Sequence, residues 1–223
     1  MDAHEHPPQA PSSQLAAVSP AVGPGLDEVA LACDPVDQFS AWLAEAVAAD
    51  LPQPNAMVLS TVSAGGWPRS RTVLLKSHGQ DGFVFYTNHT SAKAQDLAAN
   101  PRASLLFPWY ALRRQVIIQG AVSPLTVAES EPYFHSRPHG SQIGAWASRQ
   151  SSVIASRAEL DSRYARLAQR WPEGTAVPMP DFWGGYRVSH ETVEFWHGRL
   201  NRLHDRLRYR RSGARWIVER LSP

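Results

Sequence analysis

The segment AMVLSTVSAGGWPRSRTVLLKS, residues 56–77, decides the fold of this chain. It holds two runs rich in β-branched and other apolar residues, 56–63 and 69–77, on either side of the turn-forming residues Ala64-Gly65-Gly66. Runs of this composition that flank a short glycine turn are typical of antiparallel strands. The segment therefore predicts two neighbouring strands joined by a tight turn.

The same pattern recurs along the rest of the chain. Turn-forming residues, among them the stretch 79–82 and Asn100-Pro101, separate further short runs of β-branched and aromatic residues. These runs are 82–88, 103–109, 114–122, 186–196, 199–211 and 214–221. Closely spaced strands with short turns favour an antiparallel meander that closes into a barrel.

Helical patterns occur before and between these strands. Asp34 is a good N-cap and Pro35 a good first helical residue. The apolar residues that follow at helical spacing are Val36, Phe39, Trp42, Leu43, Ala46 and Val47. A second helical block is predicted over about 126–171, with an apolar stripe of Val153, Leu160, Tyr164, Leu167 and Trp171. Helices inserted into an antiparallel sheet indicate a mainly β or α+β fold.

The N-terminal segment, residues 1–33, is rich in Pro, Ala and Ser and lacks a sustained apolar period. Such a segment cannot bury enough apolar surface to offset the entropy lost on ordering. We therefore expect a flexible tail over 1–33, followed by a single folded domain over 34–223.

Composition limits the class of protein. With 223 residues and 43% hydrophobic residues, the chain can form a packed core. The formal net charge is only +2, so a generally basic surface for nucleic acid is not indicated. The single cysteine, Cys33, fits a reducing compartment. No apolar run is long enough to span a membrane, and we expect a soluble, cytoplasmic protein.

The most cationic stretch is RLNRLHDRLRYRR, residues 199–211. From 202 to 210 every even position is cationic, whereas the apolar residues Leu203, Leu207 and Tyr209 fall on odd positions. The even-numbered cations are Arg202, His204, Arg206, Arg208 and Arg210. Because side chains alternate between the two faces of a strand, this pattern predicts a strand with one cationic face. That face could be an anion-binding surface or an ordinary solvated one.

Several common sites are not supported by the sequence. The chain has neither a GxGxxG nor a GxxxxGK[ST] loop, and Gly140 to Gly144 has the wrong spacing for a nucleophile elbow. His135 and His139 have a spacing seen in zinc sites, but no cysteine pair accompanies them. We therefore expect no metal site.

Phosphate-binding chemistry recurs beside the predicted strands. Arg71 and Lys76 are five residues apart in one strand, so they are predicted to lie on opposite faces. The run FYTNHTSAK, residues 85–93, ends in Lys93 near a predicted helix start, where free N–H groups can bind phosphate. Tyr133, Arg137 and Ser141 would share one face of a helix. Each set could also be ordinary surface, but two anion sites suit a phosphorylated cofactor and a phosphorylated substrate.

Read together, several of these stretches closely resemble the pyridoxine/pyridoxamine 5′-phosphate oxidase family. The stretches are RTVLLK, FYTN, NPRASLLFPW, RQVIIQG, YFHSRPHGSQIGAWASRQSS, FWGGYRV and VEFWHG with RLHDR. The resemblance covers about Asp34 to Pro223. It implies the split β-barrel fold with peripheral helices and a homodimer with two FMN molecules at its interface. It also implies oxidation of pyridoxine or pyridoxamine 5′-phosphate to pyridoxal 5′-phosphate, with oxygen as acceptor and hydrogen peroxide as second product.

The resemblance also implies residue roles. The FMN site would comprise Arg71, Thr72, Val73, Leu74, Lys76, Tyr86, Thr87, Lys93, Gln115, Gln150, Ser151, Trp196 and Arg206. The substrate site would comprise Lys76, Tyr133, Arg137, Ser141, Arg202 and His204. Of these, Arg202 and His204 would face the reacting carbon and the pyridine ring, and the C-terminal strands over 186–223 would complete the site. Arg208 and Arg210 have no family role and are expected to be solvated.

Two features depart from the family pattern. Residues 1–33 lack the Arg-Arg-x-Tyr-like segment that helps to cover the substrate, and Ala92 stands where many relatives have a basic residue. The preferred vitamer, the FMN affinity and the presence of a second pyridoxal 5′-phosphate site stay open. The alternatives are an oxidase of another reduced heteroaromatic, such as a dihydrophenazine precursor, a non-catalytic flavin or pyridoxal 5′-phosphate binder, and a nucleic-acid binder.

Overall fold

The segment that decides the fold is a β-hairpin. In the computed structural model, which describes residues 25–223, β1 (Ala56–Val62) pairs antiparallel with β2 (Pro68–Leu74) over its full length. The turn places Gly66 at φ +82°, a backbone conformation that glycine adopts without strain. The prediction from the sequence is confirmed here.

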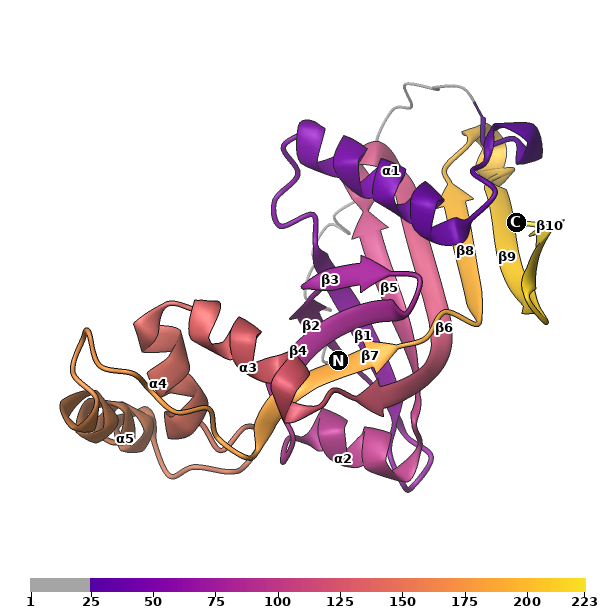
Figure 1. Ribbon diagram of the computed structural model, residues 1–223. Helices are drawn as coiled ribbons and strands as arrows, with labels where there is room; N and C mark the ends of the chain where they lie inside the picture. The colour runs from indigo at the N-terminus through magenta and orange to yellow at the C-terminus, as the bar shows by residue number, and fades with distance from the viewer. Residues whose placement is uncertain (1–24) are drawn as a thin grey trace, which may run out of the picture.

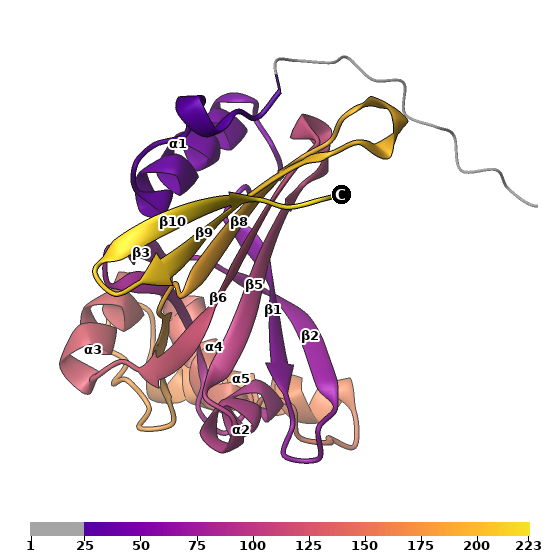
Figure 2. The ribbon, with the colours of Figure 1, turned by 90° about the vertical axis from the view of Figure 1, so that its right-hand side faces the viewer.

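The other strands extend this hairpin into one strongly curled sheet (Figure 1). They are β3 (Ser77–Gly79), β4 (Gly82–Asn88), β5 (Arg102–Trp109), β6 (Arg114–Pro124), β7 (Trp183–Val188), β8 (Thr192–His197), β9 (Asp205–Ser212) and β10 (Arg215–Arg220). Figure 2 shows the order β10-β9-β8-β6-β5-β1-β2 side by side. All the strand pairs are antiparallel. The mainly β, half-barrel fold predicted from the sequence is confirmed.

The long strand β6 causes the sheet to curl back on itself. Its first part pairs with β8 and its last residues pair with β7, with Val122 opposite Val188. Because β7 also pairs with β4, the strands β3-β4-β7 form a second layer against the first. Gly120 permits this close approach, since a Cβ there would lie 1.6 Å from the carbonyl oxygen of Ser189.

Helix α1 (Pro35–Ala48) closes the core between the layers. Asp34 is its N-cap and Pro35 its first residue, as the sequence predicts. Phe39 of this helix is fully buried and makes edge-to-face contacts with Phe83 and Phe107 at centroid distances of 5.0 and 4.9 Å. Such aromatic pairs add to the burial of their large apolar area, so α1 is an integral part of the barrel.

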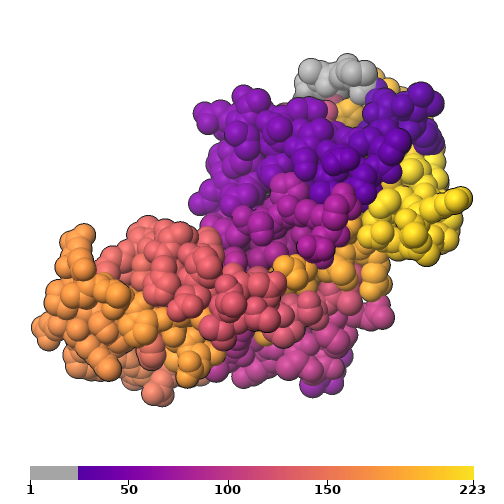
Figure 3. Space-filling model, in the orientation of Figure 1, coloured from indigo at the N-terminus to yellow at the C-terminus, as the bar shows by residue number. Residues whose placement is uncertain are grey.

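Four further helices complete the fold: α2 (Ala92–Ala99), α3 (Val127–Ser136), α4 (His139–Ala147) and α5 (Arg157–Arg170). Figure 3 shows α3 to α5 as a lobe beside the sheet. The single helical block predicted over 126–171 is wrong in detail, because Arg137 and Pro138 interrupt it and residues 148–156 form a loop. Val153, assigned to the apolar stripe, is fully exposed in that loop. None of the helices described within 25–223 is long and apolar enough to cross a membrane.

The prediction of a flexible tail is wrong for residues 25–33, whereas 1–24 lie outside the described residues. The Leu26 amide donates to Asp205 Oδ2 (3.0 Å), and Leu26 and Leu31 pack against the core. The Tyr209 hydroxyl donates to the Ala32 carbonyl at 2.6 Å. The segment is ordered because the C-terminal strands supply the partners that it lacks locally.

The arginine-rich stretch is only partly a strand. A short 3-10 turn, Leu200–Arg202, precedes β9, and Asn201 and Arg202 both have positive φ. The predicted alternation therefore begins at Asp205 and excludes Arg202 and His204. Within β9, Arg208 and Arg210 were expected to be solvated, but both form ion pairs with Glu219 of β10 at 2.7 and 2.9 Å.

Candidate active site

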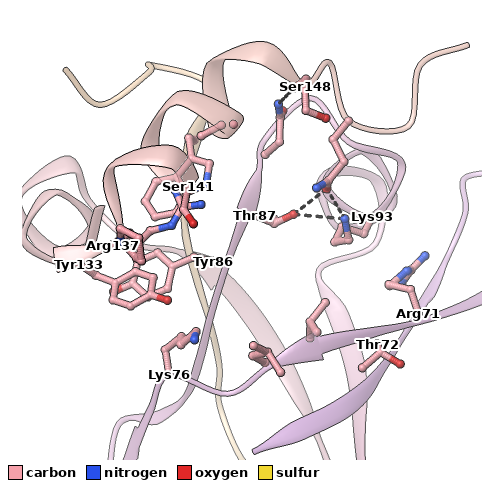
Figure 4. Close-up of a pocket in the computed structure, with 18 residues that line it drawn as sticks. Arg71, Thr72, Lys76, Tyr86, Thr87, Lys93, Tyr133, Arg137, Ser141 and Ser148 are labelled. Carbon is pink, nitrogen blue, oxygen red and sulfur yellow. Dashed lines mark hydrogen bonds between the residues drawn. The ribbon is translucent and has the colours of Figure 1, made fainter. Parts of the chain in front are cut away.

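A cavity of about 660 Å³ opens between the sheet and the lobe of α3 and α4 (Figure 4). Its wall is formed by the end of β2, by β4, by α2 and by the two lobe helices. The side chains that line it include Arg71, Thr72, Val73, Leu74, Lys76, Tyr86, Thr87, Lys93, Tyr133, Arg137, Ser141, Ser148, Gln150 and Trp183. Most of the site residues expected from the sequence therefore lie around one cavity.

One side of the cavity holds Arg71, fixed by a buried carboxylate. Asp96 of α2 is 2% exposed and lies 3.5 Å from Arg71 Nη2. It also accepts from the Thr61 hydroxyl (2.7 Å) and from Arg69 Nη1 (3.2 Å). Arg71 Nη1 donates to Thr61 Oγ1 at 2.7 Å. Charge-assisted contacts of this kind hold a guanidinium in one orientation.

Lys93 lies beside Arg71 and is also buried. Ser91 caps α2, and the Lys93 ammonium donates to Thr87 Oγ1 (3.2 Å) and to the Gln150 side-chain carbonyl. Burial and, as the smaller cause, the positive charge of Arg71 together lower the pKa of Lys93 to about 8. Two neighbouring cations, of which Lys93 is surrounded by neutral oxygens, form an anion site that suits a phosphate group.

The opposite side of the cavity holds a second cationic set (Figure 4). The Arg137 guanidinium carbon lies 4.9 Å from the Trp183 ring centroid, and Lys76 Nζ lies 5.5 Å from that of Tyr133. Arg137 Nη1 is buried and has no hydrogen-bond partner among residues 25–223. Burial lowers the pKa of Arg137. A buried donor without an acceptor fits an anionic ligand that would supply one.

The structure corrects two details of how these residues meet. Tyr133, Arg137 and Ser141 do not share one helix face, because Arg137 lies in an extended break between α3 and α4. The bend nevertheless directs all three into the cavity. Arg71 and Lys76 were predicted on opposite faces of a strand, but β2 ends at Leu74, and both line the same cavity.

The remaining predicted site residues lie elsewhere in the chain. Gln115 of β6 is opposite Trp196 of β8, which is opposite Arg206 of β9. The His204 ring lies 4.6 Å from that of Trp196. None of these residues lines the cavity. The set is here called the β6–β9 row and comprises Gln115, Trp196, Arg202, His204 and Arg206. Figure 1 shows β8 and β9 at the opposite end of the sheet from α3 and α4. Ser151 lines a smaller hollow next to Gln150.

Comparison with known proteins identifies the family. Residues 43–170 match the family model described as pyridoxamine 5′-phosphate oxidase. The chain belongs to the pyridoxamine 5′-phosphate oxidase family. Residues 183–223 match the model of the pyridoxine 5′-phosphate oxidase C-terminal dimerisation region, which supports a homodimer.

Curated relatives of this oxidase family are similar over most of their length. A pyridoxine/pyridoxamine 5′-phosphate oxidase of Streptomyces avermitilis is 57% identical over 204 residues, covering 89% of this chain and 91% of the relative. One from Frankia alni is 52% identical over 238 residues, covering 98% and 99%. These matches extend through both the cavity residues and the β6–β9 row.

Solved structures agree with the family fold. PhzG from Burkholderia lata 383, in complex with tetrahydrophenazine-1-carboxylic acid, has a TM-score of 0.81 and 32% identity. The match covers 86% of this chain and 94% of PhzG. A pyridoxamine 5′-phosphate oxidase-related, FMN-binding protein from Nostoc punctiforme has a TM-score of 0.67 at 16% identity, which shows the shared fold alone.

Sequence reasoning assigned no role to Asp96, Ser148 or Trp183 in this family member. Asp96 gave no local signal, because its partners Thr61 and Arg69 are 35 and 27 residues away. Trp183 lies in the quoted stretch FWGGYRV, whose glycines indicate close packing. A Cβ at Gly185 would lie 2.5 Å from Leu125 Cδ1. The two glycines after Trp183 thus mark where β7 packs closely against His89 and Leu125.

Proposed function

We propose that this protein is an FMN-dependent oxidase that converts pyridoxine 5′-phosphate and pyridoxamine 5′-phosphate to pyridoxal 5′-phosphate. Oxygen is the electron acceptor and hydrogen peroxide the second product. The observation that carries the proposal is a single cavity with a cationic set on each of two sides, in a chain that is 57% identical to an oxidase of this name. Two phosphorylated molecules, the cofactor and the substrate, account for both cationic sets.

The set around Arg71 and Lys93 would hold the phosphate of FMN. It fits because Lys93 and Arg71 are both partly desolvated, so each gains more from a phosphate than an exposed cation would. Thr72, Val73, Leu74 and Tyr86 would line the flavin, while Gln150 and Ser151 would hydrogen-bond its polar atoms. When bound, FMN accepts a hydride from the substrate and passes the electrons to oxygen.

The second set would hold the phosphate of the substrate. Lys76 and Arg137 supply positive charge, while Tyr133 and Ser141 supply hydroxyl donors, and all four line the cavity. The unpartnered Arg137 Nη1 is the group that most requires an anion. Fixing the phosphate on this side leaves the pyridine ring to extend toward the flavin, which is the orientation that hydride transfer needs.

The β6–β9 row would complete the site from the partner protomer. Gln115, Trp196 and Arg206 form a continuous row but do not reach the cavity of their own chain. The C-terminal region that carries most of this row matches a dimerisation region. In the homodimer, FMN would lie at the interface, with Arg206 and Gln115 of one protomer facing the flavin held by the other.

Arg202 and His204 would then face the reacting carbon and the pyridine ring. The His204 ring contacts Trp196, and its Nδ1 accepts from the Arg199 amide at 3.0 Å, which fixes the ring orientation. A fixed imidazole and a guanidinium at the ring can orient the substrate and offset charge that develops on it. The folded domain would include residues 25–33 as well as 34–223, because Leu26 and Leu31 pack against its core. The cytoplasmic location stays a prediction.

The visible spectrum of the FMN-loaded protein tests the proposal. The protein is mixed anaerobically with pyridoxine 5′-phosphate and then exposed to air. We expect the flavin band to bleach and then to return as pyridoxal 5′-phosphate and hydrogen peroxide appear. A flavin band that never bleaches with either vitamer would contradict the proposal and would favour a non-catalytic binder.

A second candidate is the oxidation of another reduced heteroaromatic. The likeness to PhzG, solved with tetrahydrophenazine-1-carboxylic acid, favours testing it. Lys76 and Arg137 could bind a carboxylate as well as a phosphate. Bleaching by a reduced phenazine carboxylic acid, without bleaching by either phosphorylated vitamer, would establish this alternative.

A further inference from the structure

We propose that Trp183 is the positioning residue of the substrate-phosphate site. Its indole ring is the platform on which Arg137 and the two tyrosines beside the cavity are held. The inference rests on the proposed function, because it assigns the second cationic set to a substrate phosphate. It goes further by naming the residue that gives this set its geometry.

Trp183 belongs to a group of stacked aromatic rings beside the cavity. Its ring is parallel to Tyr86 within 12° at 5.3 Å between centroids, and to Tyr133 within 16° at 6.2 Å. Tyr86 and Tyr133 in turn stack on each other at 4.2 Å. Phe134 meets the indole edge to face at 5.0 Å. The Tyr133 ring is therefore held by Tyr86 and Trp183, and Trp183 also contacts Tyr86.

The guanidinium of Arg137 depends on the same ring. Within residues 25–223 Arg137 forms no ion pair with a carboxylate. Its guanidinium carbon lies 4.9 Å from the Trp183 ring centroid and 5.6 Å from that of Phe134. A cation held over an aromatic face keeps its charge available to an incoming anion, whereas a carboxylate partner would neutralise it. The indole thus orients Arg137 without competing for the phosphate.

The position of Trp183 is itself fixed by the fold. It is 7% exposed and begins β7 opposite Asn88 of β4. A Cβ at Gly184 would lie 2.7 Å from His89 Cε1, so a larger residue there would require the His89 ring to move. The ring therefore has little freedom to move away from Arg137, which is what a positioning residue requires.

The test compares Trp183→Leu and Trp183→Phe with Trp146→Leu. Trp146 packs against the same apolar cluster, with Trp171 and Phe182. The rings beneath the Arg137 guanidinium are those of Trp183 and Phe134, not Trp146. Two quantities are measured on the FMN-loaded dimer: KM and kcat with pyridoxine 5′-phosphate, and the Kd of inorganic phosphate by calorimetry. Bound FMN fills the Arg71 and Lys93 side during the titration.

We expect Trp183→Leu to raise KM and the phosphate Kd together by about tenfold while kcat changes less than twofold, since a desolvated cation–π contact is lost. Trp183→Phe should raise both by about threefold, because phenyl is a weaker platform than indole. Trp146→Leu should leave both unchanged. If Trp183→Leu does not fold, the threefold change in Trp183→Phe is the test.

Two results would overturn the inference. One is a phosphate Kd in the Trp183 variants equal to that of the wild type. The other is a fall in kcat and FMN content that Trp146→Leu reproduces, which would indicate a merely structural role. If the wild type binds phosphate but does not oxidise either vitamer, the proposed function fails while the phosphate titration still decides the role of Trp183.

Discussion

Arg71 of β2 and Lys93 of α2 line the same side of one cavity, and the charge of Arg71 helps burial to lower the pKa of Lys93 to about 8. Asp96 pairs with Arg71 but not with Lys93, so among residues 25–223 the charge of Lys93 has no carboxylate partner. A phosphate would relieve both the repulsion and the desolvation, so this pair has a direct consequence for the pH dependence of cofactor binding.

FMN affinity should fall as the pH rises above about 8. The ammonium of Lys93 favours the phosphate only while it is protonated, and bound phosphate raises its pKa, so binding takes up a proton in this range. Fluorescence titration of the apoprotein with FMN from pH 7 to 9.5 measures the trend. Lys93→Met should bind FMN about 10- to 100-fold more weakly at pH 7 and lose the pH dependence. Lys76→Met, on the other side of the cavity, should keep the pH dependence.

Asp96→Asn should weaken FMN binding about tenfold by releasing Arg71 and Arg69 from their shared carboxylate. It should also lower the Tm by a few degrees, since ionic hydrogen bonds of a buried group contribute about 1–3 kcal/mol. FMN titration and thermal unfolding measure the two effects. Asp81→Asn, in an exposed turn, is the control. An unchanged FMN Kd together with a lowered Tm would restrict Asp96 to folding.

Asp205→Asn should lower turnover about tenfold while FMN stays bound. Asp205 follows His204 directly and accepts from the Leu26 amide (3.0 Å) and from Arg220 Nη1 (2.9 Å). Loss of these contacts would displace the turn that carries Arg202 and His204, and small displacements of catalytic groups are costly. Steady-state kinetics and the flavin spectrum are measured. Asp161→Asn, which pairs with exposed Arg157, is the control. Equal turnover in both variants would contradict this role.

The strands were predictable because their signals are local. The hairpin of β1 and β2 follows from two apolar runs and one glycine turn, and the start of α1 follows from Asp34 and Pro35. The break between α3 and α4 also had a signal, since a residue before proline, here Arg137, is disfavoured in a helix. The prediction of one helical block over 126–171 followed the spacing of the apolar residues and took no account of Pro138.

Other features depend on contacts between distant parts of the chain. Residues 25–33 contact distant parts of the chain, as in the hydrogen bond from Tyr209 to Ala32, so their composition predicted a longer tail. Asp96 of α2 gave no signal because its partners Thr61 and Arg69 lie on the β1–β2 hairpin, far away in the sequence. The predicted strand with alternating faces over 202–210 is wrong at its start, because Asn201 and Arg202 adopt positive φ. A pattern of apolar residues does not indicate a positive φ.

In the proposed homodimer, each active site combines the cavity of one protomer with the β6–β9 row of its partner. Arg137→Ala should abolish binding of the substrate phosphate in the cavity of the same protomer. Arg202→Ala should abolish turnover while FMN stays bound. Each variant alone is expected to be inactive. In a mixed dimer, one site would then be intact and the other would carry both substitutions.

The most direct measurement is the oxidase activity with pyridoxine 5′-phosphate after the Arg137→Ala and Arg202→Ala variants are unfolded together in equal amounts and refolded. Random pairing makes half of the dimers mixed, so the account predicts about a quarter of the wild-type activity. Wild-type protein taken through the same refolding sets the reference. A mixture no more active than the two separately refolded variants would contradict a site shared between protomers.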